Sequence, residues 1–334
     1  MTMKQDKTWQ YHPELPISGG TPLAPSPFKE FRLSKALFWL MWHGLLYSAN
    51  FALLLTAIGS WIFIEATGGL PTTLTLGWIG SLFLRNIFLS FLIAGGLHFF
   101  FYILNRQHET KFNLDNGFAK NNKRFTFKHQ VWDNMFWTLA SGVPLWTLCE
   151  VIYFYMLANG LTLFPLLEFS DNRVWFIILI LLVTPFESIH FFFTHRLLHW
   201  PPLYRMAHHL HHRNIRTGPW SGISMHPIEH VIYFSGFVIF LLIPAHPIHM
   251  LFFMQYLCLG AMVSHTDIQD LRIGKLTIPL GAFYHHLHHR YFECNYGTTP
   301  ILCDAAAGTF HDGTEESMKK MRDRLRSRRQ NISA

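Results

Sequence analysis

The sequence has few charged residues. Asp, Glu, Lys and Arg make up 14% of its 334 residues, whereas hydrophobic residues make up 50% and aromatic residues 16%. Soluble domains carry roughly 25% charged residues, so this chain has too little polar surface to cover itself in water. The shortage argues against an ordinary soluble protein. Apolar character continues from about residue 36 to 263, which favours one membrane-embedded unit.

Cysteine and cofactor motifs are also scarce. The four cysteines include no CxxC pair, so neither a disulfide framework nor a zinc ribbon is predicted. The chain contains no GxGxxG and no CxxCH, which gives no support for a bound dinucleotide or an attached haem. The polar N-terminus has no apolar stretch of the kind found in cleaved signal peptides. We expect residues 1–35 to form a flexible cytoplasmic leader.

Long apolar segments predict membrane crossings, each of which takes about 20 residues. Four candidates lie at roughly 37–64, 80–104, 136–158 and 174–194. A fifth apolar block, 231–263, is interrupted by Ile-Pro-Ala-His-Pro and predicts a hairpin that enters the membrane and returns. Within the second and third segments, Arg85 and Glu150 are candidates to pair or to line a polar cavity.

Basic residues indicate the orientation. The formal net charge is +7, but the basic residues form short runs between apolar segments, so no nucleic-acid partner is expected. The loop 105–135 carries six Lys and Arg residues, and the positive-inside rule places it in the cytoplasm. The cytoplasmic side then also holds both termini and the stretches 195–230 and 264–312. The membrane is expected to be a bacterial inner membrane or the endoplasmic reticulum. The predicted units are a membrane catalytic domain at 36–312, with a histidine-rich core at 175–312, and a basic tail at 313–334.

Histidine is abundant and clustered. Sixteen of the 22 histidines fall within 190–289. On a helix, residues at i, i+3 and i+4 share one face, so each of three clusters directs two or three imidazoles to one point. The clusters are HRLLH with His195 and His199, HHLHH with His208, His211 and His212, and a second HHLHH with His285, His288 and His289.

Eight converging imidazoles are too many for one metal ion, because a zinc site takes three or four protein ligands. We therefore predict two metal ions or two separate sites. His265 is a further candidate ligand, as are His226 and His230 in a connecting segment. Imidazole binds zinc, copper, iron and nickel alike, so spacing alone does not select the metal. A centre at the hydrocarbon boundary suits lipid chains, whose unactivated C–H bonds require redox-active iron and oxygen.

The order and spacing of these clusters resemble the fatty acid hydroxylase/sterol desaturase superfamily of integral-membrane non-haem di-iron enzymes. The resemblance covers roughly 175–312 and rests on HxxxH, HxxHH and a final HxxHH followed by Asn295 and Tyr296. It implies that the eight cluster histidines hold two irons. His265 lies at a position where many members also have a histidine. The predicted fold is an all-α membrane protein with about four transmembrane helices, a re-entrant or hairpin helical pair, and a cytoplasmic helical cap that carries the histidine-ligated di-metal site.

The resemblance also implies a reaction. A membrane lipid, fatty acyl or sterol, would be hydroxylated with O2, and desaturation at the same site is the alternative. Electrons would come from a cytochrome b5-type protein or a ferredoxin. A metal transporter, a haem electron carrier and a non-catalytic family member are less favoured. Acidic or polar side chains near the ligands are expected to support them; these are Glu187, Glu229, Asp267 and Asn295.

Overall fold

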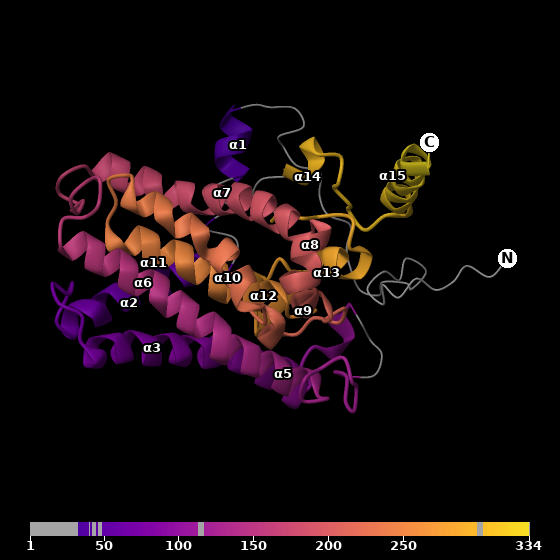
Figure 1. Cartoon of the computed structure of the whole chain (residues 1–334), viewed down its shortest axis with the longest axis horizontal. Coiled ribbons are helices and arrows are strands. Elements are labelled where there is room, and N and C mark those ends of the chain that lie inside the picture. Colours follow the sequence, from indigo (N-terminus) through magenta and orange to yellow (C-terminus); the bar gives the residue numbers. More distant parts are fainter. Residues whose placement is uncertain are drawn as a thin grey trace.

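The protein is a bundle of apolar helices with a smaller helical cap at one end (Figure 1). The computed structural model describes residues 33–39, 41, 45, 49–112, 117–298 and 303–333. Within these ranges, four helical segments are long and apolar enough to cross a membrane, and two apolar helices are shorter. The predicted helical membrane fold is thereby confirmed. Most of the predicted leader lies outside the described residues.

Three of the four long segments include π-helical turns. The first joins α3 (Leu76–Ser90), Phe91–Gly95, α4 (Gly96–His98) and Phe99–Ile103. The second joins α5 (Gln130–Trp137), Thr138–Gly142 and α6 (Val143–Ala158), and the third is α7 (Arg173–Leu198). The fourth joins α11 (Pro247–Gln255), Tyr256–Gly260 and α12 (Ala261–Ser264). The 26 residues of α7 reach about 39 Å, more than the hydrocarbon thickness of about 30 Å.

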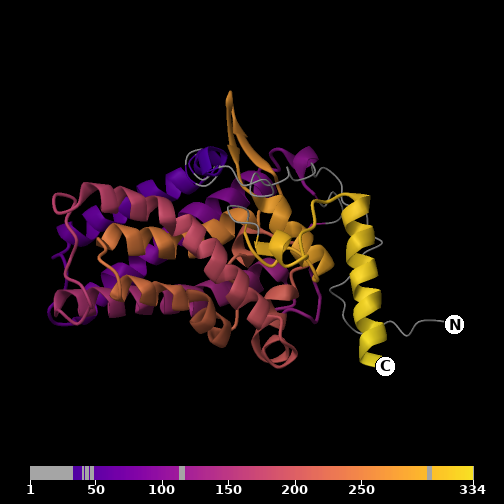
Figure 2. The same cartoon turned by 90° about the horizontal axis from the view of Figure 1, so that it is seen from above.

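The remaining elements cover one end of the bundle or complete its packing. They are α1 (Leu33–Trp39), α2 (Asn50–Ala66), the 3₁₀ turn His108–Thr110, α8 (Pro201–Leu203), the π-helical turn Tyr204–His208, α9 (His209–His212), the 3₁₀ turn Pro219–Ser221, α10 (Pro227–Phe234), the 3₁₀ helix Ser235–Leu241, β1 (Asp270–Ile273), β2 (Leu276–Pro279), α13 (Ala282–Tyr291), α14 (Cys303–Ala306) and α15 (Glu315–Ser333). Figure 2 shows α15 beyond the end of the bundle, across the direction of the long helices.

The predicted hairpin at 231–263 is present, and its return arm lies at the centre of the bundle. The arm Pro227–Leu241 leads to Pro247–Ser264, of which the apolar stretch is 78% buried. His246 caps α11 by accepting a hydrogen bond from the Ile248 N–H, and Pro247 begins the helix, where its missing N–H costs nothing. α2 packs along α11. It has 17 residues and covers only the second half of the predicted span 37–64.

A two-stranded antiparallel sheet interrupts the otherwise helical chain. β1 and β2 pair with Asp270 opposite Pro279 and Ile273 opposite Leu276. Gly274 in the connecting turn has φ of +59°, a conformation that glycine adopts without steric cost. The all-α prediction missed this hairpin, although the alternating residues around Gly274 carry a recognisable strand signal.

A buried polar network joins the first two long segments. Arg85 donates a hydrogen bond from Nη2 to Oε2 of Glu150. Oε2 also accepts one from Nδ2 of Asn86 at 2.9 Å, and Trp146 donates from Nε1 to Oε1 of Glu150 at 2.9 Å. Glu150 is fully buried. Of the two roles left open for Arg85 and Glu150, the structure therefore selects pairing.

Candidate metal centre

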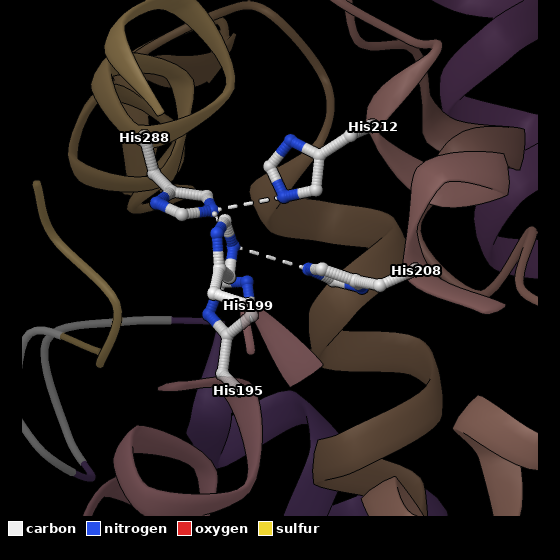
Figure 3. A group of neighbouring side chains, drawn as sticks. All are labelled: His195, His199, His208, His212 and His288. Atoms are coloured by element: carbon white, nitrogen blue, oxygen red, sulfur yellow. Dashed lines mark hydrogen bonds between the residues drawn. The ribbon is translucent and has the colours of Figure 1, made fainter. Parts of the chain in front are cut away.

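The cluster histidines and His265 form two groups. The first group contains five imidazoles whose ligand atoms lie within 4.8 Å of one another: His195, His199, His208, His212 and His288. Figure 3 shows these rings turned toward a common centre. The Nε2 atom of His199 lies 3.1 Å from that of His288 and 3.2 Å from that of His208. The Nε2 atoms of His288 and His212 are 3.0 Å apart.

The second group adjoins the first and contains four buried imidazoles: His211, His265, His285 and His289. His289 occupies its centre. The Nε2 atom of His289 lies 3.0 Å from that of His285, 3.1 Å from that of His211 and 3.2 Å from that of His265. The rings of His212 and His289, one from each group, are stacked with centroids 4.9 Å apart. The structure thus brings together all nine histidines of the three clusters and position 265.

Helical geometry explains why there are two groups. Successive residues of a helix point about 100° apart, whereas residues at i and i+4 share a face. His288 therefore joins the first group and its neighbour His289 the second. His211 and His212 divide in the same way. Each HxxHH motif consequently supplies both groups, with two ligands to one and a single ligand to the other.

Hydrogen bonds at Nδ1 orient several of these rings. The Nδ1–H of His195 donates to the carbonyl oxygen of Tyr296 at 2.6 Å, and that of His288 donates to the carbonyl oxygen of Cys294 at 2.7 Å. His265 donates in the same way to Ala261 at 2.6 Å. Because the proton is held at Nδ1, the lone pair of each ring is at Nε2, on the side of the group.

These groups fit metal ions better than they fit hydrogen bonding among themselves. Converging Nε2 lone pairs repel unless a cation lies between them. The observed separations of 3.0–3.2 Å match neighbouring nitrogen ligands about 2.1 Å from one ion. Within the described residues, Nε2 of His195 is buried without a hydrogen-bond partner, as expected for a nitrogen that faces a metal site.

The protonation state also suits metal binding. Burial lowers the pKa of His265 to about 4. Burial, followed by repulsion between the neighbouring rings, also lowers the pKa of His212 and of His289. These rings are therefore neutral near pH 7, and neutral imidazole is the form that coordinates metals.

The lowered pKa values predict that acid destabilises the metal-free protein. A histidine with a pKa near 6.5 in the unfolded chain and about 4 when folded takes up a proton on unfolding at intermediate pH. Stability is then fully present above pH 6.5 and falls as the pH decreases toward 4. The melting temperature of metal-free protein in detergent, measured between pH 7.5 and 4.5, should stay nearly constant down to about pH 6.5 and decrease from there to pH 4.5. His265→Ala should make the decrease shallower and the exposed His209→Ala should not; a flat profile would contradict the prediction.

The supporting residues lie in different places. Oε1 of Glu229 accepts a hydrogen bond from Nδ1 of His208 at 2.6 Å, as expected for a residue that orients a ligand. Glu187 accepts a hydrogen bond from Thr298 at 3.2 Å instead. Asp267 lies 3.2 Å from Nδ1 of His286, which belongs to neither group. Asn295 donates to the carbonyl oxygens of Tyr284 and His311, and so it holds the loop after α13.

His226 and His230 lie outside both groups. The side chain of His226 caps α10 by accepting a hydrogen bond from the Ile228 N–H. His230 is buried between Ser141, 2.9 Å from its Nδ1 atom, and the carbonyl oxygen of Ile223, 3.2 Å from Nε2. Local hydrogen bonding accounts for both residues.

Sequence reasoning missed Asp304, which organises the loop that contacts the first group. Its buried carboxylate accepts hydrogen bonds from the N–H groups of Tyr296 at 2.9 Å and Gly297 at 2.7 Å. It also accepts one from the hydroxyl of Tyr284 at 2.8 Å. Asp304 thereby fixes the position of the Tyr296 carbonyl, the acceptor for His195. No spacing rule indicates such a role, since the link passes through the backbone.

The Glu229 contact predicts a selective effect on the first group. Loss of an outer partner of a metal-bound histidine typically lowers metal affinity by about 10- to 100-fold. We expect Glu229→Ala to weaken one of two bound metals by this factor, because His208 loses its acceptor, and Glu229→Gln to retain more affinity. Chelator competition followed by metal analysis measures both variants. Equal weakening of both metals would contradict the assignment of Glu229 to one group.

Comparison with known proteins agrees with this geometry. Residues 177–309 match the family described as fatty acid hydroxylase. Through this segment the chain is similar to the fatty acid hydroxylase/sterol desaturase superfamily. It is 32% identical over 123 residues to a Delta(7)-sterol-C5(6)-desaturase from Nicotiana tabacum, covering 36% of this chain and 44% of that protein. It is 28% identical over 178 residues to a Delta(7)-sterol 5(6)-desaturase from Saccharomyces cerevisiae, covering 51% and 47%.

The chain thus spans about half the length of these curated relatives. No solved structure matches the chain. The matched segment 177–309 contains all nine histidines of the two groups.

Proposed function

We propose that this chain is a member of that superfamily and an O2-dependent oxidoreductase that removes hydrogen from C–H bonds of a membrane lipid. The observation that carries the proposal is a pair of adjacent, buried groups made only of imidazoles. Each HxxHH motif contributes histidines to both groups. The groups lie at the end of the long apolar segment α7 and in the cap beside it. This position favours a lipid substrate and is unlike that of a transporter, whose ligands lie near the midplane of several spans.

Two iron ions are the proposed cofactors. His195, His199, His208, His212 and His288 would hold one ion, and His211, His265, His285 and His289 the other. Bound iron would supply the oxygen activation that an unactivated C–H bond requires. The protein's own contribution is to hold the ligands rigidly and to exclude water, since every member except the half-buried His199 is buried.

Access to the first group is proposed on the side of His199. Aromatic rings surround this half-buried imidazole: the centroid of Phe292 lies 4.5 Å, that of Tyr296 4.9 Å and that of Tyr204 6.0 Å from the His199 centroid. Such rings can position an apolar substrate carbon while keeping water away from the metal.

Desaturation is the favoured outcome. The resemblance seen in the sequence predicts hydroxylation, with desaturation as the alternative. The relatives are named as Delta(7)-sterol desaturases, so they favour the alternative and a sterol-like or related lipid substrate. The electrons would come from a cytochrome b5-type protein or a ferredoxin. We also propose that the histidine groups and both termini face the cytoplasm, as the basic loop 105–135 indicates.

Lipid mass spectrometry from cells grown under isotopically heavy O2 tests the reaction. Cells that produce the wild-type chain are compared with cells that produce His288→Ala or the exposed control His209→Ala. Loss of two hydrogens from one lipid without label, in the wild type and His209→Ala only, supports desaturation. Gain of one labelled oxygen would instead establish hydroxylation. No change in any lipid, with iron bound and an electron donor supplied, would overturn the proposed activity.

A further inference from the structure

A second feature of the molecule is a cavity of about 730 Å³ beside the metal groups. It lies between the end of the first long segment, Leu76–Ile103, and the beginning of the second, Gln130–Ala158. The loop that follows α9 closes it with Arg216 and Trp220. None of the nine grouped histidines lines it. The cavity is therefore distinct from the proposed metal centre, and its size is that of a typical ligand site.

The cavity is mostly apolar and continuous with the outer surface of the helices. Three of its lining residues are largely exposed: Phe99 at 55%, Ile103 at 63% and Trp132 at 60%. These side chains lie at the ends of segments apolar enough to cross a membrane, where their exposed faces meet acyl chains. Phe118 and Trp220 add aromatic walls further in. An apolar ligand can thus enter sideways from the lipid.

The other part of the cavity is cationic. Lys111, Lys120 and Arg216 line it together with three histidines, and no Asp or Glu is among its lining residues. Lys111 is only 8% exposed. Its Nζ atom lies 3.3 Å from Oδ1 of Asn105 and 4.6 Å from the centre of the Tyr102 ring. Within the described part of the chain, no ion pair joins Lys111 to a carboxylate.

A buried lysine without a carboxylate partner is costly, and this cost indicates a missing anion. Burial, with Arg216 nearby, lowers the pKa of Lys111, and the Asp267 carboxylate, which forms no ion pair with Lys111, offsets this effect only in part. Basic residues that serve only as orientation signals remain exposed at the membrane surface. Lys111 is instead enclosed at the cavity wall.

We propose that this cavity binds an amphiphile with an anionic head group, separately from the metal centre. The apolar part lies against Phe99 and Trp132, and a carboxylate or phosphate of the head group lies at Lys111 and Lys120. An acyl chain enclosed by aromatic walls and an anion paired with a buried ammonium satisfy both parts of the cavity. The proposal does not depend on the reaction catalysed at the metal groups.

Two contacts connect the cavity to the second metal group. The Tyr102 hydroxyl donates to the carbonyl oxygen of Thr266 at 2.7 Å, and Thr266 directly follows His265. Arg216 lies 3.9 Å from Asp267, which contacts His286 beside His285. A bound amphiphile would therefore support the wall that positions two histidines of that group.

Native mass spectrometry of the full chain in detergent tests the proposal, after removal of co-purified lipid. The probes are phosphatidylglycerol, oleate and the zwitterionic phosphatidylcholine. The charge variant is Lys111→Gln combined with Lys120→Gln, and its matched control is Lys275→Gln combined with Lys319→Gln, two exposed lysines outside the cavity. A third variant, Gly95→Leu, fills the cavity without changing charge; a Cβ at Gly95 meets Phe91 and Trp220 at an ordinary 3.6 Å.

We expect saturable binding of phosphatidylglycerol or oleate in preference to phosphatidylcholine. Affinity should fall by at least about tenfold in the charge variant, since a hydrogen bond to a charged group is lost, and should also fall in Gly95→Leu. The control should bind as the wild type does. A preference for phosphatidylglycerol identifies a phosphate head group, and a preference for oleate a carboxylate. If the wild type binds all three probes alike, or a charge variant with normal metal content binds like the wild type, the proposal is wrong.

Discussion

His288→Ala and His289→Ala are each expected to lose one of two bound metal ions and to abolish turnover. The two residues are neighbours on α13, yet the Nε2 atom of His288 contacts those of His199 and His212, whereas that of His289 contacts those of His211, His265 and His285. Loss of an outer partner already lowers metal affinity or activity by about 10- to 100-fold. Loss of a direct ligand should exceed this range. Metal analysis of the purified chain gives the number of ions, and lipid mass spectrometry gives the turnover.

The matched control for both variants is His209→Ala. His209 belongs to the same HHLHH motif as His208, His211 and His212, but its side chain is exposed and it belongs to neither group. We expect this variant to keep both ions and full activity. If His209→Ala loses as much metal as His288→Ala, the histidines act through local charge or folding, and the two-group assignment is wrong.

Glu150→Leu is expected to cause the largest loss of stability. The substitution leaves the guanidinium of Arg85 buried without its carboxylate, and removal of one partner from a buried ion pair typically costs about 3–5 kcal/mol. The hydrogen bonds from Asn86 and Trp146 to the carboxylate are lost as well. In a bilayer an unpaired charge is more costly still. Thermal unfolding in detergent and the yield of folded chain measure the effect.

A double variant separates charge from packing at this position. Replacement of Arg85 by Met together with Glu150→Leu removes both charges and keeps apolar volume, and such replacements are often neutral or stabilising. We expect the double variant to recover most of the stability lost in Glu150→Leu. If the single and double variants unfold at the same temperature, the ion pair contributes nothing specific and shape alone determines packing.

The sequence predicts the helices well where the apolar runs are long. Segments such as 174–194 correspond closely to α7, because about 20 consecutive apolar residues have few alternatives in a membrane. The first predicted span, 37–64, is covered in its second half by α2 (Asn50–Ala66), whereas most of residues 40–48 lie outside the described residues.

The histidine spacing predicts the clusters but not their division. Counting is enough to show that eight imidazoles are more than one ion needs. The contacts of His288 with His199 and of His289 with His265, however, depend on how α13 is rotated against α7 and α12. The carbonyl oxygens of Tyr296 and Cys294 that orient two of the rings are likewise set by the fold. Because every residue has a backbone carbonyl, the sequence does not show which carbonyl oxygen will accept a hydrogen bond from a histidine.

Glu187 is a residue for which the sequence predicts a contact with a ligand that the structure does not show. It lies two helical turns before His195, which makes it a reasonable partner for a ligand on the same face, yet its recorded hydrogen bond is with Thr298. Spacing along one helix gives the direction of a side chain but not what the rest of the chain places there.

Because neighbouring histidines are divided between two groups, the rotation of α13 about its own axis determines which group each histidine joins. An inserted or deleted residue just before His285 could leave the helix intact, but it would rotate the three ligands by about 100°. The nitrogens that now converge in one group would then face neither group. Substitution of one histidine on α13 removes a ligand from one group, whereas a change of length displaces the ligands of both groups. The spacing of the motif relative to the rest of the chain is therefore a strict requirement.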